Sequence, residues 1–294
     1  MRMLAALATL TLAAPGGASQ VAPASAPRPA PAPAPGVTPA AATFRWTGQV
    51  IQGGLIVASA PRDAVSVTLD GTALPLAPDG RFLVGFDRDA GPQAVLQATL
   101  ADGRRITQPL AVAPRAWRIE RLNTLPRFPA PDPVMAQLRP AELAQIVAAR
   151  ARVTDAQGWR QPFRWPATGR ISGLFGAQRI YRGEPGAYHS GTDIAKPAGS
   201  PVLAPADGVV ILAADHPFTL EGNLLMIDHG DGLNSAFLHL SRITVQLGEH
   251  VRQGQPIGAV GATGRATGPH LHWSLRWRDA RLDPMLVAGE MTEK

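Results

Sequence analysis

Turn-forming residues are the feature of this chain that most restricts its fold. Its 294 residues include 30 glycines and 29 prolines, whereas aromatic residues make up 5%. The apolar stretches between these breakers are short, and in residues 65–69 and 94–98 they follow a period of two. This pattern predicts short β-strands joined by turns, and it argues against a fold dominated by long helices.

The first 42 residues differ in composition from the rest of the chain. Met1-Arg2-Met3 precede an apolar run from Leu4 to Ala14 and then small residues, which predicts a secretory signal peptide over residues 1–19. The run is too short to span a bilayer, which takes about 20 residues. Residues 20–42 are rich in alanine and proline and predict an extended linker. We therefore expect an exported protein, periplasmic or extracellular, with no transmembrane anchor after signal cleavage.

Three further segments follow the linker. Residues 43–115 contain Asp-Gly turns between apolar runs and predict a small Ig-like β-sandwich. Residues 116–165 predict a connector with one helix, which opens at Pro140 and runs to about Val153. The connector either packs between domains or also covers a substrate groove. Residues 166–288 predict a second, glycine-rich β domain, and residues 289–294 a tail.

Charge and cysteine content exclude several classes of protein. The chain has 28 basic and 22 acidic residues, a net charge of +6 and a pI near 10.8, which favours anionic surroundings. The arginines are scattered instead of clustered among aromatic residues, so we expect no nucleic acid partner. An anionic envelope polymer fits the charge. Because cysteine is absent from the sequence, disulfides, thiolate metal sites and lipid-modified cysteines are excluded.

The histidines carry the strongest chemical signal, because all of them lie between His189 and His272. His189 and Asp193 are separated by three residues that include Gly191, and glycine permits the tight turn that would let the two side chains converge. In a strand, His270 and His272 would share one face about 7 Å apart. One of this pair could hold a metal while the other contacts a water on it.

Two imidazoles and a carboxylate suit a catalytic zinc with an open fourth position. In such a site zinc lowers the pKa of water from about 15.7 to about 7 and polarises a carbonyl group. A neighbouring histidine, whose ordinary pKa is about 6.5, can accept and return protons. The same ligand set also serves non-haem iron oxygenases, but the sequence gives no sign of a cosubstrate site.

Ordered blocks between residues 166 and 286 resemble the lysostaphin/LytM-type zinc peptidases. The matching blocks are residues 169–176, 188–194, 201–209, 222–230, 237–240 and 264–272. The resemblance implies an all-β, largely antiparallel domain of the duplicated hybrid motif type, with one zinc ion in its groove. The implied activity is that of an exported zinc metalloendopeptidase that hydrolyses peptide cross-links of bacterial peptidoglycan.

The resemblance also implies a role for each residue of the constellation. His189, Asp193 and His272 would bind the zinc ion, and His270 would be the general base with His239 as its partner. A periplasmic enzyme would cut the D-alanyl to diaminopimelate bond, although a glycine bridge is an alternative. A non-catalytic member of the same fold, one that binds cell wall or activates another hydrolase, is a second alternative.

The chain departs from many relatives at Phe237, where they carry tyrosine. We expect the ring to pack against the cleft wall and a hydroxyl donor to be lost. The remaining polar residues of this region receive lesser predictions. We expect loop bracing or substrate binding at Arg179, Tyr188, Asn223 and Thr267, a structural turn at His229, and surface positions at His216 and His250. The N-terminal sandwich could bind an envelope protein, shield the groove or act as a spacer.

Overall fold

The computed structural model describes residues 43–124 and 133–291. These residues belong to one compact unit that starts at Ala42. The predicted signal peptide and linker, over residues 1–42, lie outside the described residues. Among the described residues, no helix has both the length and the apolar character needed to cross a membrane.

Two small antiparallel sheets form the N-terminal part of this unit, with strand orders β1-β2-β5 and β4-β3-β6-β7. Their strands are β1 (Arg45–Gly48), β2 (Leu55–Ser59), β3 (Ala64–Leu69), β4 (Thr72–Leu74), β5 (Arg81–Gly85), β6 (Gln93–Leu100) and β7 (Arg105–Ala111). Alternate residues of β6 are buried, as expected of a strand with one solvated face. Ile56, Phe82 and Leu96 are fully buried and belong to the main core.

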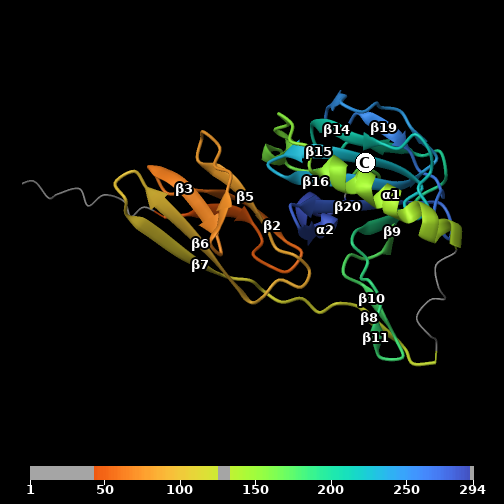
Figure 1. Cartoon of the computed structure of the whole chain (residues 1–294), viewed down its shortest axis with the longest axis horizontal. Coiled ribbons are helices and arrows are strands. Elements are labelled where there is room, and N and C mark those ends of the chain that lie inside the picture. The colour runs from red at the N-terminus through yellow and green to blue at the C-terminus, as the bar shows by residue number, and fades with distance from the viewer. Residues whose placement is uncertain (1–42, 125–132, 292–294) are drawn as a thin grey trace, which may run out of the picture. The chain divides into compact units, whose positions relative to one another are not determined.

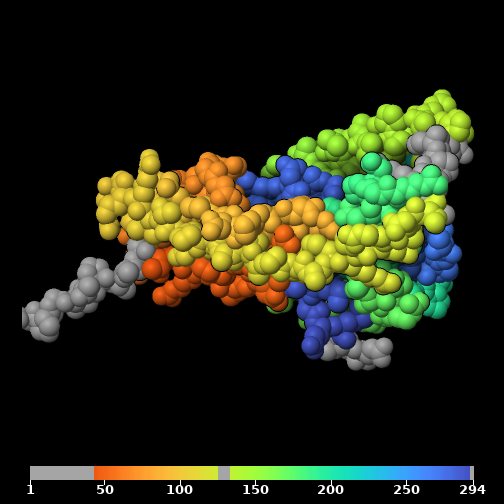
Figure 2. Space-filling view, turned by 90° about the horizontal axis from the view of Figure 1, so that it is seen from below, coloured from red at the N-terminus to blue at the C-terminus, as the bar shows by residue number. Residues whose placement is uncertain are grey.

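The segment after β7 joins the two parts of the chain through a strand and a helix, β8 (Ile119–Leu122) and α1 (Pro133–Arg150). Strand β8 pairs in parallel with β10 (Gln178–Tyr181), and β10 pairs with β11 (Glu184–Pro185) to form a hairpin. In the space-filling view of Figure 2, the yellow segment that ends in β8 lies against the green spheres of this hairpin.

The predicted start of the helix was wrong, because α1 begins at Pro133 and contains Pro140 in its interior. Proline is favourable at the first helical position, and at Pro140 it removes one backbone hydrogen bond. Because Pro140 is exposed, water can reach the carbonyl group that loses its donor. Tertiary contacts also hold the helix: the buried Glu142 carboxylate accepts hydrogen bonds of 2.6 Å from both the backbone and the hydroxyl group of Thr219.

One large antiparallel sheet organises the rest of the chain, in the strand order β18-β14-β15-β16-β20-β12-β9, with β21 paired to β20. These strands are β9 (Arg170–Gly173), β12 (Thr192–Ala195), β14 (Gly208–Ala213), β15 (Asn223–Gly230), β16 (Leu233–Leu240), β18 (His250–Val251), β20 (His270–Trp277) and β21 (Ala280–Leu282). A smaller sheet contains β13 (Pro201–Leu203), β17 (Arg242–Ile243) and β19 (Pro256–Ala259), and two short helices are η1 (Gly158–Arg160) and α2 (Pro284–Ala288). The prediction of an all-β fold is therefore confirmed.

The two faces of the large sheet pack against different neighbours. Leu271, Trp273 and Leu275 of β20 point into the main core, so the alternate residues His270 and His272 point to the other face. Directly paired residues share a face. Leu238 of β16 pairs with His272, so Leu238 also points to the face that carries the histidines.

Helix α1 packs on this same histidine-bearing face, but over other strands. Its Ile146 and Ala149 form a second core cluster with side chains of β14, β15 and β16, among them Leu212, Met226 and Ala236. Figure 1 shows α1 in front of the strands of this sheet. The connector therefore covers the β14 to β16 part of the face and leaves β20, which carries the histidine pair, and β12 beside it.

A carboxylate in the turn between β15 and β16 ties this sheet to the N-terminal strands. Asp231 Oδ2 accepts a hydrogen bond of 3.1 Å from the backbone of Leu83, and Asp231 has a left-handed backbone with φ of 52°. Burial raises the pKa of this carboxyl group to about 6. Because the ordinary pKa is about 3.9, the folded protein binds this proton more tightly than the unfolded chain. Stability therefore falls as the pH rises from about 4 through about 6.

We predict that Asp231→Asn raises the free energy of unfolding by about 1 kcal/mol at pH 7.5, after discounting for solvent screening, and leaves it unchanged at pH 4. Asparagine keeps an oxygen acceptor for Leu83 and tolerates the left-handed backbone, but it carries no charge to bury. Urea denaturation at both pH values measures the effect.

Asp70→Asn is the matched control, because Asp70 also has a positive φ of 47° and accepts a backbone hydrogen bond, from Val95, but is exposed. Its effect on the free energy of unfolding should be small, because the exposed side chain stays in contact with water. A variant at Asp231 that gains no stability at pH 7.5 contradicts the burial cost.

Candidate metal centre

Strand pairing brings two of the three predicted ligands, Asp193 and His272, together. Asp193 of β12 lies directly opposite His272 of β20 in the antiparallel register, so both side chains emerge on one face. His272 Nδ1 is 2.8 Å from Asp193 Oδ1. Two elements distant in sequence thus contribute a nitrogen and an oxygen to the same point.

His189 joins this pair from the loop that follows β11. Its Nδ1 lies 3.0 Å from the carbonyl oxygen of Leu174, which makes Nδ1 the protonated nitrogen and leaves the Nε2 lone pair free. Nε2 lies 3.1 Å from Asp193 Oδ1 and 3.0 Å from His272 Nδ1. The backbone carbonyl group of Leu174 therefore selects the tautomer that a metal requires.

The three ligand atoms fit a zinc ion. A tetrahedral site with bonds of about 2.0–2.1 Å separates its ligand atoms by about 3.3 Å, close to the separations of 2.8–3.1 Å here. Burial would raise the pKa of the Asp193 carboxyl group, but the contacts with His189 and His272 outweigh it and hold the pKa well below its usual value. An ionised oxygen and imidazole lone pairs at one point call for a cation, and among the described residues these three form a group that could hold one.

His270 and His239 lie beside this cluster with a shared arrangement. Nδ1 of His270 lies 2.8 Å from the carbonyl oxygen of Gly268, and Nδ1 of His239 lies 2.8 Å from that of Thr263. In each ring the Nε2 lone pair is therefore free to accept a proton. The ring centroids are 4.8 Å apart, and His270 Nε2 lies 3.8 Å from Asp193 Oδ1. The structure thus brings all five predicted site residues together.

A β-bulge places His239 in this group. The register of β15 against β16 shifts between Asn223 and Leu225, so one residue of β16 is left unpaired near His239. His239 adopts a φ of 64°, a left-handed conformation that is uncommon for residues other than glycine. Strict alternation would turn its side chain away from Leu238 and into the core, whereas the bulge turns it toward His270.

Phe237 does not lie in the cleft wall, contrary to our expectation. Its side chain is fully buried in the main core, and it pairs with Trp273, whose side chain also points to the core face. The face that carries His272 is the opposite one. The exchange of tyrosine for phenylalanine therefore alters the core beneath the sheet and not the groove.

Most of the other polar residues singled out in the sequence make structural contacts. Arg179 forms an exposed ion pair of 2.8 Å with Glu120, and the Asn223 side chain donates to the carbonyl oxygen of Leu240 at 2.8 Å. Both contacts join paired strands, β10 to β8 and β15 to β16, and do not brace loops. Thr267 is exposed, and Tyr188 packs between two arginines, as described below.

The three remaining histidines lie outside the cluster. His229 is fully buried in β15, between the Asp207 carbonyl group and the Ser235 hydroxyl group, and burial lowers its pKa to about 4. Its role is structural, but it lies in a strand and not in a turn. His216 and His250 are exposed, as predicted.

Comparison with known proteins bears directly on these residues. The family model described as Peptidase family M23 matches residues 187–284, a range that contains all five histidine and aspartate positions of the cluster. A crystal structure of a protein from Pseudomonas aeruginosa described as an M23 peptidase is 30% identical, covers 82% of this chain and 96% of its own, and superposes with a TM-score of 0.61.

Two curated relatives each match part of the chain. Peptidoglycan DD-endopeptidase ShyA of Vibrio cholerae is 44% identical over 117 residues, which are 40% of this chain and 27% of the relative. Cell division protein DipM of Caulobacter vibrioides is 34% identical over 157 residues, which are 50% of this chain and 25% of the relative. This chain therefore spans about a quarter of the length of these relatives.

We predict that Gly191→Ala weakens zinc binding at least about tenfold, the range expected when the support of a ligand is disturbed. A β-carbon at Gly191 would lie 2.6 Å from both His272 Nε2 and the backbone oxygen of Trp273, so the ligand or its strand must move. Competition with a chromophoric chelator measures the affinity. Gly91→Ala is the control, because a β-carbon there meets no described atom within 4 Å. Unchanged zinc affinity in Gly191→Ala contradicts the prediction.

Proposed function

The chain belongs to peptidase family M23, and from this membership we propose that it is a zinc-dependent endopeptidase that hydrolyses peptide cross-links of bacterial peptidoglycan. The observation that carries the proposal is the convergence of His189 Nε2, Asp193 Oδ1 and His272 Nδ1 at 2.8–3.1 Å from one another, beside two further histidines with free Nε2 atoms. Such a set serves hydrolysis at a bound metal better than a purely structural role.

His189, Asp193 and His272 would hold the zinc ion. A zinc ion bound at this site would act as a Lewis acid. It would lower the pKa of water and polarise the carbonyl group of the scissile bond. The protein leaves the site accessible, because the side chains of His189, Asp193 and His270 are 26%, 21% and 17% exposed. A substrate peptide can therefore reach the ligand atoms.

His270 is the better candidate for the general base. Its Nδ1–H is donated to the Gly268 carbonyl group, so Nε2 can take a proton from the attacking water and return it to the leaving amine. His239 has the same tautomer, but burial and the neighbouring histidines lower its pKa to about 4. Its role is to hold the attacking water while His270 takes the proton.

The substrate class rests on relatives and on charge. The relative from Vibrio cholerae is named a peptidoglycan DD-endopeptidase, and the net charge of +6 suits an anionic wall polymer. We propose the D-alanyl to diaminopimelate cross-link as the bond cleaved. The signal-peptide pattern of residues 1–19 supports action in the periplasm.

We predict that His270→Ala and His239→Ala each reduce cleavage of purified sacculi at least about 100-fold while zinc content stays near one ion per chain, because removal of a general acid–base group typically costs 10²–10⁴-fold. Mass spectrometry of the released muropeptides measures both the rate and the bond cleaved. Elemental analysis of the purified variants measures zinc.

His216→Ala is the control, since His216 is exposed and lies outside the cluster, and it should retain full activity. Wild-type protein that purifies with iron, or with no metal, overturns the assignment of zinc. Cleavage by His270→Ala at the wild-type rate overturns the catalytic role and favours a binding or activating function.

A further inference from the structure

The position of His189 depends on a short stretch of backbone at the base of the β10–β11 hairpin. The backbone of His189 donates to the Ala177 carbonyl group and accepts from Gly176, both at 2.8 Å. Its ring Nδ1 donates to the Leu174 carbonyl group at 3.0 Å, and this hydrogen bond orients the ring. A shift of residues 174–177 would therefore move the ligand itself.

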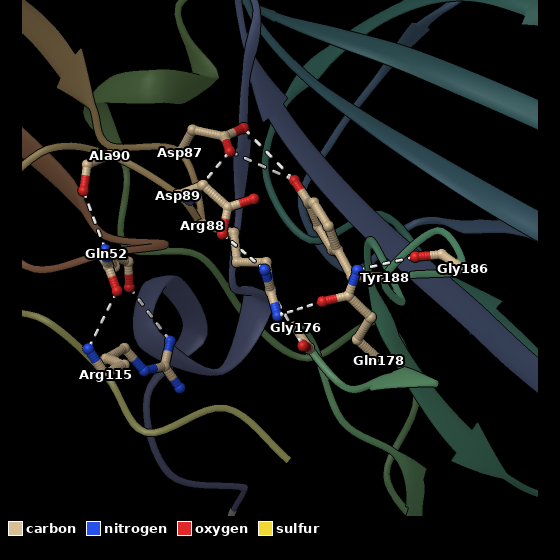
Figure 3. A network of polar contacts seen from close by, with 10 residues as sticks. All are labelled: Gln52, Asp87, Arg88, Asp89, Ala90, Arg115, Gly176, Gln178, Gly186 and Tyr188. Atoms are coloured by element: carbon tan, nitrogen blue, oxygen red, sulfur yellow. Dashed lines mark hydrogen bonds and ion pairs between the residues drawn. The ribbon is translucent and has the colours of Figure 1, made fainter. Parts of the chain in front are cut away.

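An arginine of the N-terminal sandwich holds this stretch. Arg88 lies in the loop between β5 and β6 and is 6% exposed. Its Nε donates to the Gly176 carbonyl group at 3.1 Å, and its Nη2 donates to Gln178 Oε1 at 3.0 Å. Gln178 in turn donates to the Gly186 carbonyl group at 2.8 Å, which ties the two arms of the hairpin together. Figure 3 shows this chain of contacts from the sandwich loop to the hairpin.

The residue before the ligand is held by the same loop. The guanidinium groups of Arg88 and Arg281 lie 4.7 Å and 5.2 Å from the ring centroid of Tyr188, which are favourable cation–π distances. Asp87 Oδ2 accepts from the backbone of Arg281 at 2.9 Å, and the Tyr188 hydroxyl group lies 3.4 Å from Asp87 Oδ1 (Figure 3). The ring thus has little freedom to move.

The aromatic ring of Trp117 also packs against the backbone of this stretch, at Gly176. A β-carbon at Gly176, whose φ is 78°, would lie 2.1 Å from the ring of Trp117, so the indole packs directly on the backbone there. Trp117 also lies under the guanidinium group of Arg115, at 4.5 Å, and Arg115 forms an ion pair of 2.8 Å with the buried Asp283.

A second set of contacts fixes the sandwich loop itself. Gln52 donates to the Ala90 carbonyl group at 2.9 Å and accepts from the backbone of Arg115 at 3.0 Å. Arg88 Nη1 is paired with Asp89 Oδ1 at 2.5 Å. These contacts fix the loop that carries the Arg88 guanidinium group (Figure 3).

We propose that residues 87–89 of the N-terminal sandwich are a positioning element for the metal ligand His189, with Arg88 as the central residue. The inference rests on the proposed metal function, and it gives the sandwich a role within the enzyme. Arg88 does not touch the metal ligands. It acts through the Gly176 backbone and the Gln178 side chain, as outer residues do when they orient a metal ligand.

Arg88→Ala tests the inference, and its zinc affinity should fall about 10–100-fold in chelator competition, as is typical when a supporting contact of a ligand is removed. In zinc-free protein, amide hydrogen exchange of residues 174–189 should become faster while exchange in β2, β5 and β6 stays as in the wild type. Activity should fall at limiting zinc and recover in part at saturating zinc.

Arg88→Lys should restore part of the affinity, because an ammonium group can still donate to the Gly176 carbonyl group but lacks the planar fork. Arg104→Ala is the matched control in the same sandwich, since its partner Asp102 is exposed, and it should leave zinc affinity unchanged. If Arg88→Ala does not fold, Gln178→Ala removes the tie to Gly186 and should show the same faster exchange.

Wild-type zinc affinity together with wild-type exchange of residues 174–189 in Arg88→Ala overturns the positioning role. The exchange measurement requires no metal. Failure of the wild type to bind zinc would therefore count against the proposed function alone, whereas unchanged exchange would count against the positioning element alone.

Discussion

The register between β12 and β20 is the constraint on which the metal centre depends. Asp193 faces His272 only because Ala195 pairs with His270 and Thr192 with Trp273, and a slip of one residue would send the side chains of one strand to the other face. Burial of the large side chains on the opposite face, Trp273 above all, makes such a slip costly. The core beneath the sheet thus determines the geometry of the ligands above it.

The centre also needs room, and a small residue supplies it. A β-carbon at Gly173 would lie 2.2 Å from Asp193 Oδ2, so the position of β9 that pairs with Asp193 has no room for a side chain. Helix α1 and the N-terminal strands contact other parts of this region. The helix covers β14 to β16 on the face that carries the ligands, while Arg88, in the loop between β5 and β6, contacts Gly176 beside the loop of His189. These added segments leave the ligand atoms partly exposed to solvent.

Local patterns in the sequence predicted the features that depend on local geometry. His270 and His272 share a face because they belong to one regular strand, and the glycines and short apolar runs correctly indicated an all-β fold. Features that depend on distant contacts were missed. Pro140 resembles a helix start, yet the helix begins at Pro133, and Arg139, on the N-terminal side of Pro140, is anchored to the distant Glu221. Arg88 contacts residues 88 and 90 positions away, and no pattern around it indicates this. The predicted domain boundaries, and the binding of an envelope protein, stay predictions.

The bulge at His239 places an imidazole where the backbone favours glycine. The left-handed conformation costs on the order of 1 kcal/mol or more for a residue with a β-carbon, a cost that folding alone does not require. A lineage released from selection for hydrolysis would therefore lose the reason to hold a residue with a β-carbon in this conformation. Glycine at this single position, in a descendant that keeps the rest of the fold, would be a record of lost activity.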